Sequence, residues 1–146
     1  MISAMSRRPV VISPITPLFR REGVDVALVS VELWRTQTII RLAALVDDPL
    51  GAETAFGDAL DAWAEGGRRP PAPDAPGDRF YQDVAISLAD DVGTDYAWQS
   101  SAVGGTGRLF CGDWHFPVGV PEKATRLIVK AAGGDGEGGS IELPLS

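Results

Sequence analysis

The stretch LIVKAAGGDGEGGSIELPL, residues 127–145, indicates the fold most clearly. Apolar residues alternate with other residues in two runs, and a glycine-rich segment, residues 133–139, separates them. This alternation is typical of strands with one buried face, and the glycines predict the turn of a hairpin. The segment has no lysine and precedes no helical pattern, so it does not match a phosphate-binding loop. The facing apolar positions are Leu127, Val129 and Ala131, and Ile141, Leu143 and Leu145.

Residues 109–116 show the same alternation just before this hairpin. We expect one set of side chains, Phe110, Gly112, Trp114 and Phe116, to face the core. The other set includes the only cysteine and the only histidine of the chain, Cys111 and His115. These two residues should therefore lie on the solvated face of the strand.

Two further strands are expected over residues 24–34 and 38–46. In the first, the apolar phase changes near Leu28 and Val29, which predicts one extra, bulged residue at that point. Pro14 and Pro17 interrupt the segment before it and favour an edge strand.

The sequence pattern changes between these strands and residue 79. Apolar residues at helical spacing predict a helix over about residues 51–65, and Asp48 followed by Pro49 forms a typical helix start. Residues 66–78 are rich in glycine and proline and predict an irregular loop.

Short strands, turns rich in glycine and proline, and a single helix favour a mostly-β fold. We expect residues 1–146 to form a single domain, an immunoglobulin-like antiparallel β-sandwich into which the helix 51–65 and the loop 66–78 are inserted. A parallel α/β fold is disfavoured, because strands and helices do not alternate along the chain.

The 146 residues contain 13 basic and 20 acidic side chains, which gives a net charge of −7. Nucleic acids and anionic membranes bind clustered positive charge, so neither is an expected partner. A single cysteine excludes an internal disulfide. The sequence contains neither a signal-peptide pattern nor a run of apolar residues long enough to span a bilayer, so we expect a cytoplasmic protein without membrane insertion.

The sequence contains few residues that could carry out catalysis. Cys111 and His115 are four positions apart in the predicted strand, a separation of roughly 13 Å, which is too far for a nucleophile and its base. The sequence has no Gly-x-Ser-x-Gly motif. We expect no enzymatic activity and no cofactor.

Calcium binding remains an alternative. Asp90, Asp91 and Asp95 bring three carboxylates into one predicted turn, and hard cations prefer oxygen ligands. The spacing does not match an EF-hand loop, and aspartates in turns commonly accept hydrogen bonds from their own backbone. The structural interpretation is therefore preferred over a calcium or small-ligand site.

Two aromatic residues are candidates for a partner-binding surface. Trp34 and Trp98 each lie beside a predicted strand end or phase change, so their side chains are not assigned to the core. We expect a non-catalytic protein-interaction module that binds a partner, or a copy of itself, through sandwich loops or edge strands.

The carboxyl-terminal half of the chain resembles a group of actinobacterial proteins. The resemblance is carried by these motifs: Asp90-Asp91-x-Gly93-Thr94-x-Tyr96, Gly104-Gly105-x-Gly107, Trp114-x-Phe116, Val120-Pro121 and Leu127-x-Val129. The strand Val31-Glu32-Leu33-Trp34 is similar as well. The resemblance implies an immunoglobulin-like sandwich, like domains found in bacterial surface and anti-sigma proteins, and it brings no catalytic residues.

Overall fold

A computed structural model describes residues 10–97, 100–105, 108–134 and 136–145. The described chain forms nine strands and two helices. In chain order these are β1 (Val10–Ile12), β2 (Thr16–Arg21), β3 (Val24–Leu33), β4 (Thr38–Leu45), α2 (Pro49–Glu65), α3 (Pro76–Phe80), β5 (Ala85–Asp90), β6 (Ser100–Gly104), β7 (Leu109–Phe116), β8 (Arg126–Ala132) and β9 (Gly138–Pro144).

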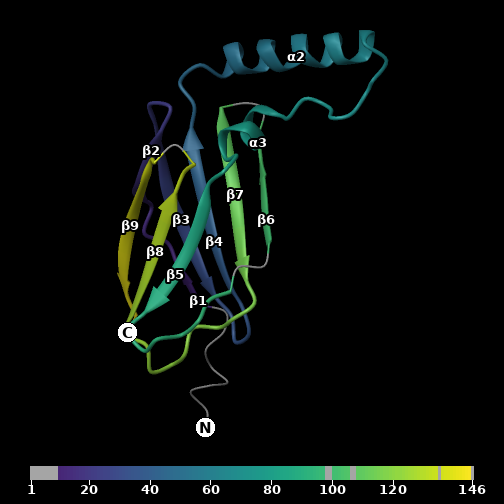
Figure 1. Ribbon diagram of the computed structural model, residues 1–146. Coiled ribbons are helices and arrows are strands. Elements are labelled where there is room, and N and C mark those ends of the chain that lie inside the picture. Colours follow the sequence, from purple (N-terminus) through teal and green to yellow (C-terminus); the bar gives the residue numbers. More distant parts are fainter. Residues whose placement is uncertain (1–9, 98–99, 106–107, 135, 146) are drawn as a thin grey trace.

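The strands form two antiparallel sheets packed face to face (Figure 1). The larger sheet has the order β1-β3-β4-β7-β6, and β2 pairs with the same edge of β3 as β1 does. The smaller sheet has the order β5-β8-β9. The expected mostly-β antiparallel sandwich is confirmed.

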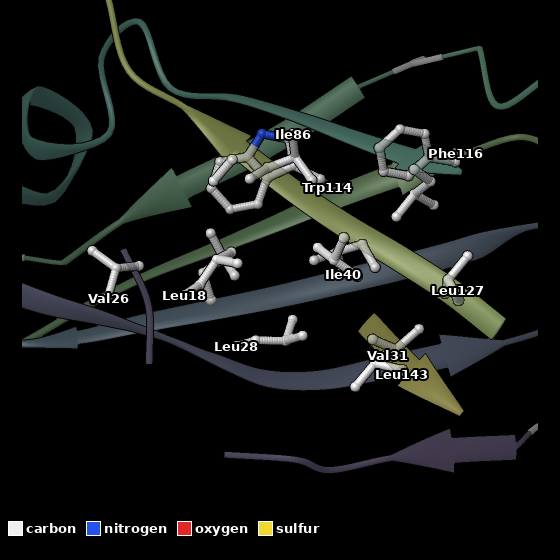
Figure 2. Close-up of a cluster of buried hydrophobic side chains, with 14 of the residues drawn as sticks. Leu18, Val26, Leu28, Val31, Ile40, Ile86, Trp114, Phe116, Leu127 and Leu143 are labelled. Carbon is white, nitrogen blue, oxygen red and sulfur yellow. The ribbon is translucent and has the colours of Figure 1, made fainter. Parts of the chain in front are cut away.

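The core fills the space between the sheets, where Figure 2 shows side chains from both layers pointing toward one another. The pairing of β3 with β4 shifts register between Leu28 and Ser30, so a bulge lies at the position predicted from the phase change. Because of this shift, both Leu28 and Val31 are fully buried although they are three residues apart. The bulge thus keeps both halves of β3 facing the core.

The predicted carboxyl-terminal hairpin is confirmed, although Ala131 lies opposite Gly139, outside the expected apolar set, and Leu145 follows the end of β9. Leu127 lies opposite Leu143, and Val129 lies opposite Ile141. The glycine-rich segment turns the chain, and the amide of Gly133 donates to the carbonyl of Glu137 at 2.6 Å.

Helix α2 confirms the predicted helix, although it begins two residues earlier, at Pro49. The carboxylate of Asp48 accepts a hydrogen bond from the amide of Gly51 at 3.0 Å and caps the helix. In Figure 1 this helix lies across one end of the sandwich rather than against the face of a sheet. Most of its side chains are exposed.

The prediction of an irregular loop over the whole of residues 66–78 is wrong at its end, because α3 begins at Pro76. Proline is favoured in the first turn of a helix. The burial of Gly77 and Phe80 then fixes this short helix against β6 and β7. Such tertiary packing is not visible in the local sequence pattern.

Among the residues that the structure describes, no helix has both the length and the apolar character needed to cross a membrane.

Candidate functional site

Strand β6 forms a free edge of the larger sheet. It pairs with β7 and with no other described strand. Its five residues, Ser100–Gly104, include no charged residue and no proline, and the first three are exposed. Natural proteins commonly protect sheet edges with charges, prolines or bulges. Within its described bounds, β6 has none of these features.

The opposite edge of the same sheet is interrupted. Pro14 lies in the break between β1 and β2, and Pro17 lies within β2. The pairing of β2 with β3 also shifts register between Pro17 and Phe19. A partner strand would find no continuous row of donors and acceptors along this edge.

The outer edges of the smaller sheet are less available to a partner strand than its strand order suggests. Strand β9 contacts β2, and Gly139 lies so close to the carbonyl of Leu18 that a Cβ atom would overlap it. Strand β5 keeps one free edge, but it ends in the charged residue Asp90. Among the described strands, β6 therefore offers a free edge that has no charged residue and is not interrupted by proline or by a register shift.

Helix α3 fixes one end of β6. The amide of Gly77 donates to the carbonyl of Gly105, just after β6, at 2.7 Å. The backbone of Gly104 lies so close to Gly77 that any side chain at position 77 would overlap it. This contact holds the edge strand in place before any partner binds.

Trp34 directly follows β3 and is 38% exposed. Its indole Nε1 donates to Oε1 of Glu32 at 3.2 Å. Arg41 contacts the same carboxylate at 2.6 Å and Asp113 at 2.8 Å. The hydrogen bond from Arg41 lowers the pKa of Glu32, although burial opposes this effect. Trp98, the second candidate, lies outside the described residues, so the expected aromatic patch stays a prediction.

Cys111 and His115 lie on the outer face of the larger sheet, as expected. Cys111 is exposed and pairs with Ala43, while His115 is half-buried and pairs with Ile39. The side chains between them in the strand alternate, so Gly112 and Trp114 face the core. The strand geometry therefore keeps this cysteine and this histidine from forming a catalytic pair.

The Asp90 carboxylate accepts several hydrogen bonds from its own turn. The donors are the amide of Val92 at 2.9 Å, the amide of Thr94 at 3.1 Å and the hydroxyl of Tyr96 at 2.7 Å. Burial would raise the pKa of Asp90, but these bonds outweigh it and lower the pKa to about 2.

Asp91 connects the same turn to the start of β8. Its carboxylate accepts hydrogen bonds from the amide of Thr125 at 2.8 Å, from the amide of Arg126 at 3.3 Å and from the Thr125 hydroxyl. Asp95 is exposed. Within the described ranges, no group of three or more acidic, histidine or cysteine side chains could hold a metal ion. The carboxylates of Asp90 and Asp91 thus stabilise the turn. No further feature of the described residues supports calcium binding.

A groove that the sequence pattern did not indicate lies between α2 and α3. Its volume is about 460 Å³. The helical spacing of Ala52, Ala55, Phe56 and Ala59 indicated one face of α2, and this face lines the groove. The sequence could not show that α2 would lie across the end of the sandwich, where that face is left partly open.

Comparisons with known proteins indicate the fold alone. No protein-family model matches the chain, and no curated protein matches it. Among solved structures, the chain is similar to the crystal structure of the conserved domain protein from Bacillus anthracis. The two share 15% sequence identity with a TM-score of 0.50, over 94% of this chain. The chain spans about half of that protein, since the match covers 50% of it.

Proposed function

We propose that this chain is a non-catalytic interaction module that binds a partner protein, or a second copy of itself, by adding a strand to β6. The free edge of β6 carries the proposal. Strand addition uses main-chain hydrogen bonds for affinity and neighbouring side chains for specificity.

The arrangement around β6 supports this mode of binding. Ser100 and Ser101 are exposed, and the strand end at Gly104 is fixed by α3. A rigid edge loses little conformational freedom when a partner strand pairs with it. The other edge of this sheet is interrupted by two prolines, so pairing should be confined to one side.

The experiment compares the wild-type chain with two lysine variants in a crosslinking capture from an extract of the native host. Ala102→Lys places a charge on β6, where edge lysines disfavour strand addition. Ala132→Lys places the same charge at an exposed position of β8, an inner strand of the smaller sheet. Sedimentation of the purified chain tests self-association with the same variants.

We expect the wild-type and Ala132→Lys chains to form the same crosslinked complex and the Ala102→Lys chain to lose it. A monomeric chain that captures no partner would contradict the interaction role. A complex that survives in the Ala102→Lys chain would show that β6 is not the contact.

A further inference from the structure

We infer that the groove between α2 and α3 is a second docking site, separate from β6, and that it binds a cationic amphipathic helix of another protein. The inference goes beyond strand addition, because the two sites have no lining residue in common. It depends on the shape of the groove, on the support of α2 and on the charge around it.

The groove has one largely apolar wall, one wall of mixed polarity and a floor from the core. One wall is the face of α2 that carries Ala52, Ala55, Phe56 and Ala59. Phe80 of α3 and Phe110 of β7, both buried, form the floor. The opposite wall is Pro73, Asp74, Pro76 and Arg79.

Helix α2 is incompletely covered by its own chain. It has 17 residues, and among the other elements it chiefly contacts α3. In proteins, most helical stability comes from packing an amphipathic face against other elements. The exposed Ala55 and Ala59 lie on the groove side of the helix. Covering this face would stabilise α2.

Helix α2 is anchored to the core at its first end, and its other end is bonded to the loop that follows it. Ala52, near the first end, packs against the core. Near the other end, the indole Nε1 of Trp63 donates to the carbonyl of Arg69 at 2.8 Å. A preformed groove reduces the free-energy cost of ordering on binding.

The charge of the groove lining, together with that of α2 as a whole, favours a cationic occupant. Outside the lining, the exposed surface of α2 carries four acidic residues and no basic residue: Glu53, Asp58, Asp61 and Glu65. Glu22 and Asp74 add two acids to the groove lining, against the single cation Arg79. Complementary charge steers association and disfavours partners of the wrong sign. Nucleic acids and anionic lipids are excluded by the same argument.

The shape favours a chain segment over a small molecule. Small-molecule sites enclose most of the surface of their ligand, whereas this groove is partly open to solvent. Helix-in-groove recognition requires an open apolar channel that accepts anchors at helical spacing. Alanine at positions 52, 55 and 59 lets the backbone of a second helix approach α2 closely.

Titration calorimetry on the full chain with two synthetic helical peptides tests the inference. One peptide carries leucine on one face and lysine on the other, over about four turns, and its counterpart carries glutamate in place of lysine. The variants Ala59→Arg and Ala62→Arg add the same charge to α2 at exposed positions, but only Ala59 lines the groove. Arginine has a high helix propensity, so both variants should keep the helix.

We expect the leucine–lysine peptide to bind, with affinity that falls as salt rises. Ala59→Arg should weaken this binding about tenfold, and Ala62→Arg should change it about twofold or less. If both variants weaken peptide binding equally, the weakening comes from surface charge alone, and the inference is overturned. No binding of the lysine peptide, or equal binding of the glutamate peptide, would overturn it as well.

The two proposals fail separately. The peptide titration does not involve Ala102, and the Ala102→Lys capture does not require the groove. Loss of the captured complex in the Ala102→Lys chain together with a negative titration would remove the groove inference and leave the proposed function in place. The opposite pair of results would remove strand addition at β6 alone.

Discussion

The hydroxyl of Tyr81 donates a buried hydrogen bond of 2.8 Å to the carbonyl of Phe110, a residue 29 positions further along the chain. Tyr81 directly follows α3, and Phe110 belongs to β7. The Tyr81 ring also packs edge-on against Trp114, with the ring centroids 5.6 Å apart. Burial raises the pKa of Tyr81, so its hydroxyl stays protonated and able to donate. This contact fixes α3 to the larger sheet and thereby positions both the end of β6 and the groove.

Replacing Tyr81 by phenylalanine should remove this bond and leave the rest of the ring packing in place. We expect the free energy of unfolding to fall by about 1 to 2 kcal/mol, because a buried carbonyl loses its partner. Denaturant unfolding of the wild-type and Tyr81→Phe chains measures the difference. An unchanged unfolding midpoint would show that the bond contributes nothing to the attachment of α3.

The hydrophobic core predicts a larger effect at Leu127, which is fully buried between the sheets (Figure 2). Leu127→Ala should lower the free energy of unfolding by roughly 3 kcal/mol through lost burial and a residual cavity. Leu50→Ala is the matched control, because Leu50 is 73% exposed and should change the value by about 0.5 kcal/mol or less. Similar costs at both positions would contradict the assigned core.

The turn after β5 predicts a dependence of stability on pH. Burial opposes ionisation of Asp90, but the hydrogen bonds it accepts lower its pKa from 3.8 to about 2. The stabilisation should be complete above the pKa of the unfolded chain, about 4, and should disappear as the pH falls toward 2. Its size is about 1 kcal/mol after allowance for solvent screening.

Unfolding measured at several pH values for the wild-type and Asp90→Asn chains tests this dependence. The variant should be less stable near neutral pH, and the difference between the two chains should shrink as the pH falls from about 4 to 2. A difference that stays constant across this range would show that ionisation of Asp90 is not the cause.

The same turn predicts the response to calcium. The oxygens of Asp90 and Asp91 already accept hydrogen bonds from Thr94, Tyr96 and Thr125. Millimolar calcium should therefore leave the melting temperature unchanged, since only a ligand that binds the folded state raises it. A calcium-dependent increase that is lost in Asp91→Asn would restore the calcium alternative. Magnesium is the control for a general salt effect.

Local patterns in the sequence were sufficient to predict individual strands. The bulge at β3 was predicted because Leu28 and Val31 break a period of two, and both are buried in the structure. The hairpin of β8 and β9 was predicted because its facing positions, such as Leu127 and Leu143, are apolar in register. Both features depend on neighbours in sequence, which periodicity reports directly.

Long-range placement could not be predicted in this way. The pairing of β4 with β7 joins Ile40 to Trp114, 74 positions apart by numbering, and no local pattern encodes it. The orientation of α2 was also hidden, because the stripe that includes Phe56 would look the same on a helix packed against a sheet. The groove and the free edge of β6 arise from these long-range arrangements, so the candidate sites required the structure.

Hydrogen–deuterium exchange tests strand addition at β6 most directly. The exchange of amides in residues 100–104 is measured for the chain alone and for its crosslinked or copurified complex. Strand addition predicts strong protection of those amides in residues 100–104 that point to the free edge, because a partner strand would accept their hydrogen bonds, with little change in β8 at the centre of the other sheet. A complex that leaves the exchange of β6 unchanged would contradict the proposed mode of binding.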